Sequence, residues 1–153
     1  MDLKDYIRSI KDYPKKGILF RDITTLIKDE LAFEATINQI VEKSKKFKVD
    51  KIAAIESRGF VFASAVSYIL KKPFIMLRKK NKLPADVHSV DFQLEYGTAT
   101  IEVHKDSISE NDSVLIIDDL IATGGTAEAA AKLIEISKGK VAAFIFVINL
   151  FDL

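Results

Sequence analysis

The chain has 153 residues, a formal net charge of +1 and no cysteine. A chain of this length fits a single domain. Because its net charge is close to zero, no overall electrostatic attraction to nucleic acid or to a membrane surface is expected. Without cysteine the chain has no disulfide and no thiolate metal site. With 48% hydrophobic residues it can bury a core, and we expect one domain over residues 1–153.

Hydrophobic periodicity predicts strands that alternate with helices. An amphipathic helix is expected at residues 1–9, then a turn-rich segment at 12–17 and an apolar patch at 18–20. The pattern then predicts helix 29–47, strand 51–55, helix 59–70, strand 73–77, basic loop 78–82, hairpin 87–103, strand 114–117, helix 126–137 and strand 141–148. This order indicates an α/β fold, with a mostly parallel twisted sheet flanked by helices and an antiparallel hairpin.

The most apolar run covers residues 141–151. It is about half as long as the ~20 residues that a membrane span requires. We therefore interpret it as a buried strand and expect a cytoplasmic protein with no membrane or nucleic-acid partner.

The stretch VLIIDDLIATGGTA at residues 114–127 predicts a ligand site. An apolar strand ends in Asp118 and Asp119, and ligands of open α/β sheets bind at the carboxyl ends of strands. Gly124 and Gly125 then precede a helix N-terminus, whose free N–H groups attract phosphate. Acids beside a phosphate repel it by about 4 kcal/mol at ~4 Å in a medium of dielectric constant near 20. A phosphorylated sugar with bound Mg²⁺ removes this conflict, because the acids can accept hydrogen bonds from sugar hydroxyls.

This stretch resembles the phosphoribosyl-pyrophosphate motif of the type I phosphoribosyltransferases. It differs from a P-loop, since no lysine follows the glycines, and the dinucleotide fingerprint is absent. The resemblance implies that Asp118 and Asp119 hold the ribose 2′ and 3′ hydroxyls. It also implies a 5′-phosphate loop made of Ala122, Thr123, Gly124, Gly125 and Thr126.

Further segments resemble the adenine phosphoribosyltransferases, in that family's order along the chain: residues 10–24, 54–60, 82–84 and 94–97. The resemblance implies a hood, formed by about the first 30 residues, that binds the base. Within it Phe20 would stack on adenine, and the backbone of Leu19 and Arg21 would read the edge of the base.

The resemblance also implies a pyrophosphate side of the site. Glu56, Ser57 and Arg58 match the family's pyrophosphate loop, in which the bond corresponding to Glu56–Ser57 is cis. Arg58 can hold phosphate oxygens with two parallel hydrogen bonds. Arg78 and Lys82 would help to neutralise pyrophosphate, and the loop 83–93 would close over the reactants.

The reaction that the resemblance implies is transfer of the phosphoribosyl group from 5-phosphoribosyl 1-pyrophosphate to adenine, with Mg²⁺. Glu95 is the candidate for handling the purine proton, and Arg58, Asp118 and Asp119 are the other candidate catalytic residues. The counterpart of Arg78 reaches the neighbouring subunit's site, so a homodimer is expected.

Two alternatives stay open at the level of sequence. One is a phosphoribosyltransferase for hypoxanthine, guanine or xanthine. The other is a regulator that binds phosphoribosyl pyrophosphate without catalysis. Departures from the family pattern include Asn149, where an acid is common, Asn81, where glycine is common, and residues 63–65, where a segment containing glycine is usual.

Overall fold

A computed structural model of the chain describes residues 2–94, 96–120 and 125–150. Its elements are, in order, the 3₁₀ helix η1 (Leu3–Tyr6), β1 (Arg8–Lys11), β2 (Leu19–Asp22), α1 (Thr24–Ile27), α2 (Glu30–Ser44), β3 (Lys51–Ile55), α3 (Arg58–Leu70), β4 (Phe74–Lys79), β5 (Val87–Gln93), β6 (Thr98–His104), β7 (Ser113–Asp118), α4 (Gly125–Ile136), β8 (Lys140–Phe146) and α5 (Val147–Leu150). None of the helices in this described part combines the length and the apolar character needed to cross a membrane.

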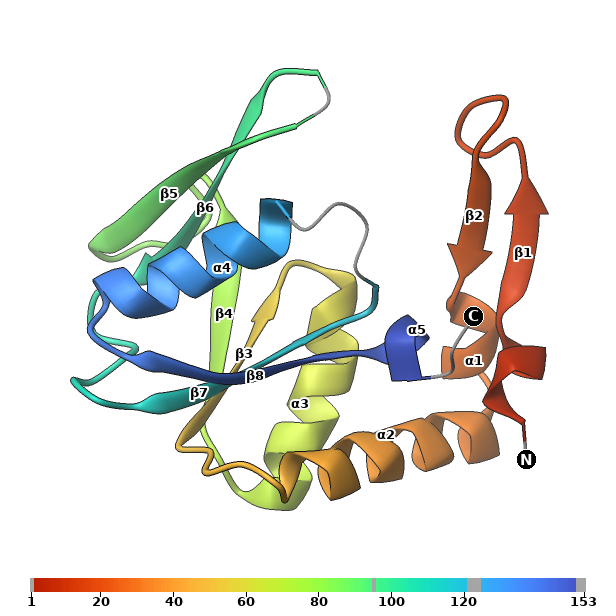
Figure 1. The fold of residues 1–153 in the computed structure, drawn as a ribbon, viewed down its shortest axis with the longest axis horizontal. Coiled ribbons are helices and arrows are strands. Elements are labelled where there is room, and N and C mark those ends of the chain that lie inside the picture. The colour runs from red at the N-terminus through yellow and green to blue at the C-terminus, as the bar shows by residue number, and fades with distance from the viewer. Residues whose placement is uncertain (1, 95, 121–124, 151–153) are drawn as a thin grey trace.

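The main sheet has six strands in the order β5-β6-β4-β3-β7-β8 (Figure 1). The neighbouring strands β4, β3, β7 and β8 run parallel, and β6 pairs antiparallel with both β4 and β5. This confirms the predicted mostly parallel sheet with an antiparallel hairpin. Since β3 and β7 are parallel neighbours, the segments that follow them emerge at the same edge of the sheet.

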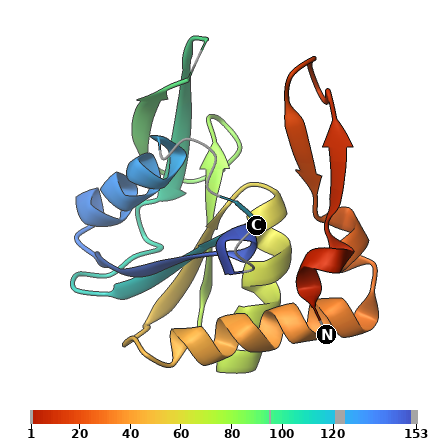
Figure 2. The same ribbon diagram turned by 45° about the vertical axis from the view of Figure 1, so that its right-hand side comes forward.

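Alternate residues of the central strands pack into two different cores. In β3, Ile52 and Ala54 belong to the core formed with α2 and α3, whereas Ala53 and Ile55 belong to the core that includes residues of α4. Figures 1 and 2 show α3 and α4 on opposite faces of the sheet. Both faces are thus covered, which explains why β3 and β7 read as continuous apolar runs.

The N-terminal segment differs from the helix predicted for residues 1–9. Only Leu3–Tyr6 is helical, as one 3₁₀ turn, and the chain is extended from Arg8 because β1 pairs antiparallel with β2. Pairing with the next strand, β2, has outweighed the local helical spacing. Leu3 and Ile7 are nevertheless buried in the core beside α2. The β1–β2 sheet stands apart from the main sheet in Figures 1 and 2.

The segment after β4 also differs from its prediction. Arg78 and Lys79 belong to the strand itself rather than to a basic loop, because they pair with Glu102 and Ile101 of β6. Residues 87–93 form β5, so the non-strand connection between β4 and β5 covers only residues 80–86. Asn81 in this connection has a φ of 67°, a left-handed conformation that asparagine adopts more readily than most residues.

Candidate functional site

The end of β7 lies directly against the start of α3. A Cβ atom on Gly59 would lie 3.0 Å from Asp118 Oδ1 and 3.1 Å from the carbonyl oxygen of Ile117. No larger side chain fits there without displacing the backbone of β7. The pyrophosphate-loop candidates and the ribose candidates, which are about 60 residues apart in sequence, therefore meet at one edge of the sheet.

The peptide bond between Glu56 and Ser57 is cis, which confirms that prediction. Ser57 occupies the N-cap position of α3, and Arg58 is the first residue of the helix. The N–H groups of Arg58 and Gly59, at the start of this 13-residue helix, have no partner within the helix and carry partial positive charge, whereas the N–H of Phe60 donates to the carbonyl oxygen of Ser57 at 3.1 Å. The loop therefore presents an arginine and a helix N-terminus together.

The two adjacent acids occupy different environments. Asp118 Oδ1 accepts a hydrogen bond from the Asp119 N–H at 2.8 Å, and the side chain of Asp119 is buried. Burial, together with the neighbouring charge of Asp119, raises the pKa of Asp118 to about 7, against a smaller opposing effect of Arg58. Asp118 is therefore an acid that changes its charge near neutral pH.

Arg58 connects the ribose candidates with the base candidates. Its Nε lies 2.7 Å from Asp119 Oδ2, although its N–H is not directed at that oxygen, so the contact is an ion pair without a hydrogen bond. The carbon atom Cζ of the same guanidinium lies 5.8 Å from the centroid of the Phe20 ring. One side chain thus faces both the acid after β7 and the aromatic ring of the hood.

On the pyrophosphate side, Glu56 gathers the predicted cations. Its Oε1 accepts hydrogen bonds from the Lys79 N–H at 2.9 Å and from Arg78 Nε at 3.2 Å, and its Oε2 accepts one from Lys82 Nζ at 2.9 Å. Burial would raise the pKa of Glu56, but these three donors outweigh it and the pKa is lowered. Glu56 is consequently an ionised carboxylate at neutral pH.

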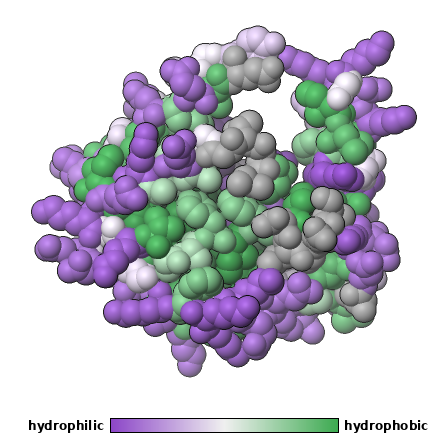
Figure 3. Space-filling model, in the orientation of Figure 1, coloured by the Kyte–Doolittle hydropathy of each residue, from purple (hydrophilic) through white to green (hydrophobic). Residues whose placement is uncertain are grey.

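The base candidates lie on β2, in the hood. Leu19 is half exposed, Phe20 packs edge-on against the ring of Tyr13 with centroids 5.1 Å apart, and Arg21 donates to Ser9 Oγ at 2.5 Å. The tip of the hood reaches toward the other hairpin, because Lys15 Nζ lies 5.7 Å from the centroid of the Tyr96 ring. Figure 3 shows an opening between the hood and the β5–β6 hairpin.

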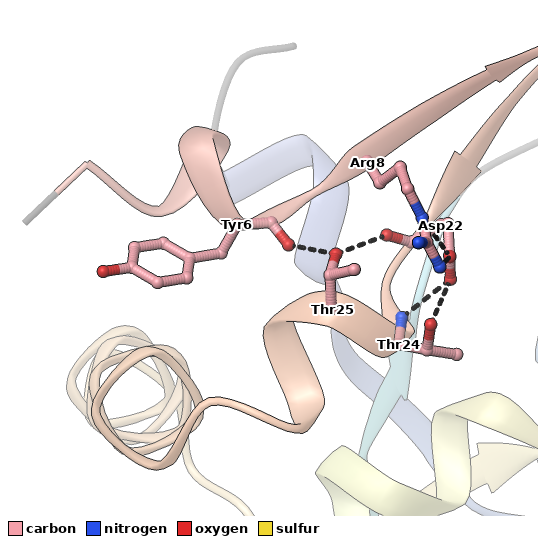
Figure 4. Close-up of polar contacts among 5 residues, drawn as sticks. All are labelled: Tyr6, Arg8, Asp22, Thr24 and Thr25. Atoms are coloured by element: carbon pink, nitrogen blue, oxygen red, sulfur yellow. Dashed lines mark hydrogen bonds and ion pairs between the residues drawn. The ribbon is translucent and has the colours of Figure 1, made fainter.

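A polar network fixes the base of the hood and was not predicted from the sequence (Figure 4). Asp22 Oδ1 accepts from the N–H and the hydroxyl of Thr24 at 2.9 and 2.6 Å, and Asp22 Oδ2 accepts from Arg8 Nε at 3.0 Å. The hydroxyl of Thr25 donates to the carbonyl oxygen of Tyr6. The hydrogen bond from the Thr24 hydroxyl, followed by the one from Arg8, lowers the pKa of Asp22 to about 2. The spacing Asp-x-Thr is the one signal in the sequence that could have indicated this network, since an aspartate often accepts from the backbone two residues later.

Part of the predicted phosphate loop is described. Gly125 and Thr126 form the start of α4, and Thr126 lines a cavity of about 660 Å³ together with Glu56 and Lys82. The predicted residues Ala122, Thr123 and Gly124, and also Glu95, lie outside the described residues. The cavity therefore joins the start of α4 to the cation cluster at the end of β4.

These contacts define a site with three kinds of chemistry. Arg58, Arg78 and Lys82 offer positive charge and N–H donors suited to phosphate oxygens. Asp118 and Asp119 offer acceptors suited to hydroxyl groups. Phe20 offers a ring face suited to a planar base.

Comparison with known proteins agrees with this geometry. Residues 24–149 match the phosphoribosyl transferase domain family. The chain is 83% identical over its whole length to an adenine phosphoribosyltransferase of Pelagibacter ubique, of which it covers 87%. It also resembles the crystal structure of adenine phosphoribosyltransferase from Thermoanaerobacter pseudethanolicus, with a TM-score of 0.91 and 47% identity over 94% of this chain and 84% of that one.

A third comparison concerns a relative with bound ligands. The adenine phosphoribosyltransferase of Saccharomyces cerevisiae, solved with adenine and an imino-altritol bisphosphate, has a TM-score of 0.86 and 30% identity over 98% of this chain and 89% of that one. The sequence matches and the structural matches extend over nearly the whole chain and share one fold. The chain belongs to the adenine phosphoribosyltransferase family of type I phosphoribosyltransferases.

Proposed function

We propose that this chain transfers the 5-phosphoribosyl group of 5-phosphoribosyl 1-pyrophosphate to adenine, forming AMP and pyrophosphate. The bond from C1′ to the pyrophosphate oxygen breaks, a bond from adenine N9 to C1′ forms, and N9 loses its proton. The observation that carries the proposal is the contact between Arg58 of the pyrophosphate loop and Asp119 after β7, which brings a phosphate-binding group and a ribose-binding group together. The family of the chain supports adenine as the base.

Asp118 and Asp119 are proposed to accept hydrogen bonds from the ribose 2′ and 3′ hydroxyls. Both lie at the end of β7, at the edge where the segment after β3 also emerges. In this position their charge lies near the positive charge that develops on the ribose as pyrophosphate departs. The acids would thus both orient the sugar and stabilise the transition state.

Arg58, Arg78 and Lys82 are proposed to bind the pyrophosphate group. Negative charge grows on this group during the reaction, so fixed donors there lower the barrier. The N-terminus of α3, with Ser57 at its N-cap, adds backbone N–H groups to the same side. Arg58 would hold the leaving group while Asp119 turns to the ribose.

The 5′-phosphate is proposed to lie at the start of α4, bound by Gly125 and Thr126 and by the preceding residues 122–124. A helix of 12 residues supplies partial positive charge at that end. The lack of a Cβ atom at Gly125 lets the backbone approach a phosphate closely. The ribose would then extend from this loop toward Asp118.

Adenine is proposed to insert beside Phe20, with the backbone of Leu19 and Arg21 at its edge. The ring of Phe20 and the guanidinium of Arg58 face one another across the contact between the hood and α3. Both kinds of surface stack well on a purine. Glu95, which precedes Tyr96 in the β5–β6 connection, stays the proposed group for handling the N9 proton.

Mg²⁺ is the proposed metal, held mainly by oxygens of the substrate. Within the described residues Asp118 and Asp119 form a pair of neighbouring acids, and no cluster of three or more metal-ligating side chains forms. A pair is enough for Mg²⁺, which usually keeps several waters and takes phosphate oxygens as further ligands. When bound, Mg²⁺ would neutralise charge on the pyrophosphate, and Asp118 and Asp119 are the residues positioned to contact its waters.

A homodimer in the cytoplasm is the proposed state of the enzyme. Val61 and Tyr68 are seven residues apart on α3, so they share a face, and they are 39% and 86% exposed. Met76 on the adjacent strand β4 is also 45% exposed. Exposed apolar side chains on one helix face support a second copy as the partner, and light scattering of Tyr68→Lys should then report a monomer. The lack of cysteine suits the reducing cytoplasm.

AMP formation from phosphoribosyl pyrophosphate tests the proposal, with adenine, hypoxanthine, guanine and xanthine offered separately. We expect turnover with adenine that is abolished by EDTA and by Asp119→Asn, and unchanged in Asp106→Asn, which removes an exposed acid. Turnover with another base would replace adenine in the proposal. Binding of phosphoribosyl pyrophosphate without turnover would identify a regulator instead.

A further inference from the structure

The polar groups of Glu56 are directed at the end of β4 and the turn that follows. Its backbone N–H donates to the carbonyl oxygen of Leu77 at 3.0 Å, and its carboxylate accepts from Lys79, Arg78 and Lys82. The carboxylate is 7% exposed. Glu56 is therefore a buried anion that clamps the neighbouring strand and two cationic side chains.

A buried carboxylate is a poor ligand for pyrophosphate. Both groups are negative, and their repulsion is strongest where water is excluded. The family resemblance placed Glu56 among the residues that bind phosphoribosyl pyrophosphate, but the contacts of its two oxygens assign it a different task.

Arg78 and Lys82, the cations that Glu56 holds, keep most of their N–H donors for binding a ligand. Arg78 is 32% exposed and donates to Glu56 through Nε, while Lys82 is 47% exposed and donates one hydrogen bond. An arginine has five N–H donors and a lysine three, so both retain donors for phosphate oxygens. Because there are two cations and one anion, the cluster also keeps an excess of positive charge.

We propose that Glu56 is a positioning residue that acts through Arg78 and Lys82. It fixes the two cations where negative charge develops on the departing pyrophosphate, and it makes no contact with a phosphate oxygen. This inference rests on the proposed function.

The expected signature is a fall in the rate of the chemical step with little change in substrate affinity. Removing the charge of Glu56 releases Arg78 and Lys82 from a fixed position, which weakens the binding of phosphoribosyl pyrophosphate. It also removes the repulsion between Glu56 and the pyrophosphate group, which strengthens this binding. These two effects oppose each other in the ground state. In the transition state the fixed position of the two cations has the larger effect, because preorganised donors stabilise the negative charge on pyrophosphate as it forms.

Glu102 of β6 provides a matched control, because its carboxylate supports the same turn. It is also buried, and its Oε1 accepts from the Asn81 N–H at 2.9 Å, just as Glu56 accepts from the Lys79 N–H. Its other partner is the hydroxyl of Ser89 rather than a cationic side chain. Glu56→Gln and Glu102→Gln therefore perturb the same turn, but Glu56→Gln alone removes the anion that holds Arg78 and Lys82.

The test compares single-turnover rates of AMP formation, with enzyme in excess, for the wild type, Glu56→Gln, Glu56→Asp and Glu102→Gln. We expect Glu56→Gln to be slower by about tenfold or more, with a KM for phosphoribosyl pyrophosphate within about threefold of the wild type. Glu56→Asp restores the charge and should recover part of the rate, while Glu102→Gln should react at the wild-type rate. In a Lys82→Met background, Glu56→Gln should reduce the single-turnover rate by a smaller factor than it does in the wild type, because Glu56 and Lys82 act together.

Other outcomes overturn the inference. An unchanged rate with a lowered KM would mean that Glu56 only competes with the substrate for the cations. An equal loss of rate in Glu102→Gln would mean that the rate depends on the stability of the turn and not on the charge of Glu56. If the wild type itself forms no AMP, the proposed function fails and this inference fails with it, whereas a wild type that reacts no faster than Glu56→Gln refutes the inference alone.

Discussion

The guanidinium of Arg58 and the carboxylate of Asp119 lie 2.7 Å apart, so the candidate pyrophosphate loop is paired with one of the candidate ribose-binding acids in the structure. The same holds on the other side of the site, where Arg78 and Lys82 pair with Glu56. Each of these cations is thus matched by an acid from the site itself. In the proposed reaction, substrate binding exchanges the partners of Arg58 and Asp119, with phosphate oxygens replacing Asp119 at Arg58 and ribose hydroxyls replacing Arg58 at Asp119, while Glu56 keeps its hold on Arg78 and Lys82.

This exchange predicts that the shape of Arg58 matters as well as its charge. Arg58→Lys keeps one positive charge but loses the planar fork and the flat face toward Phe20. We expect kcat/KM for phosphoribosyl pyrophosphate to fall by about 100-fold, as for loss of one donor that stabilises transition-state charge. Steady-state AMP formation measures this loss, and thermal melting verifies that the variant is folded. Wild-type kinetics in Arg58→Lys would show that charge alone is sufficient.

The raised pKa of Asp118 predicts a pH dependence of stability. The folded state binds a proton at Asp118 up to about pH 7, whereas the carboxyl of an unfolded chain has the ordinary value of 3.8. The stabilisation that this proton provides is therefore full below pH 3.8 and is lost as the pH rises to about 7. The amide of the Asp118→Asn variant cannot titrate, so this variant should gain stability relative to the wild type between these two pH values and keep the gain above them.

Thermal denaturation of both proteins at pH 4, pH 5.5 and pH 8, values chosen to span roughly the titration range, measures this gain. Asp106→Asn, at an exposed acid, serves as the control and should show no such trend. A constant difference between Asp118→Asn and the wild type at every pH would show that Asp118 titrates normally.

Asp22 predicts the opposite pH dependence. Its pKa is lowered to about 2, so its stabilising effect is full above the ordinary value of 3.8 and is lost as the pH falls toward 2. Asp22→Asn should reduce the free energy of unfolding by about 1–3 kcal/mol at pH 7, since a buried charged hydrogen-bond acceptor is removed. Urea denaturation at pH 7 and at about pH 2.5 provides the comparison, and the deficit should shrink at the lower pH.

Asp12→Asn is the matched control for Asp22, because Asp12 lies in the same hood but is exposed and accepts from the Gly17 N–H at 2.7 Å. Its stability should stay within about 0.5 kcal/mol of the wild type. If both variants lose the same stability, the Arg8–Asp22–Thr24 network stabilises the fold no more than the exposed Asp12–Gly17 hydrogen bond does.

The contact of Gly59 with β7 predicts a steric effect on the site. In Gly59→Ala the new Cβ would meet Asp118 Oδ1 at 3.0 Å and a backbone oxygen at 3.1 Å, and the backbone oxygen cannot rotate away. We expect a loss of about 1–3 kcal/mol in unfolding free energy and a lowered kcat, because Asp118 is displaced. Ser64→Ala, at an exposed position of the same helix, should be neutral or slightly stabilising. A Gly59→Ala protein as stable and as active as the wild type would mean that α3 can shift without affecting the site.

The central α/β layer was predictable from local pattern. Strand 51–55 was predicted with the bounds that β3 has, and helix 59–70 begins one residue later than α3. These segments are buried on both faces or carry a clear apolar stripe, so the sequence pattern and the tertiary environment agree. Asp29, which caps α2 through the Ala32 N–H, likewise sits at the predicted start of that helix.

Contacts between separate elements were not predictable. The strand β1 is set by its pairing with β2, and the contact of Lys15 with Tyr96 joins residues that are about 80 positions apart. The resemblance to a family supplied the candidate residues, but it did not indicate that Glu56 would gather Arg78 and Lys82. Such an arrangement depends on the register of β3 against β4, which no local pattern encodes.

The separation of the hood from the main sheet has a consequence for how such enzymes can diversify. Within the described residues β1 and β2 pair only with each other, and the strands that carry the phosphate-binding and ribose-binding candidates belong to the other sheet. With the base bound in the hood as proposed, a change of recognised base requires no change of strand register in the main sheet. Chimaeras that exchange residues 8–22 among related chains therefore offer a way to change the preferred nucleobase while the main sheet, with its candidate phosphate-binding and ribose-binding residues, stays the same.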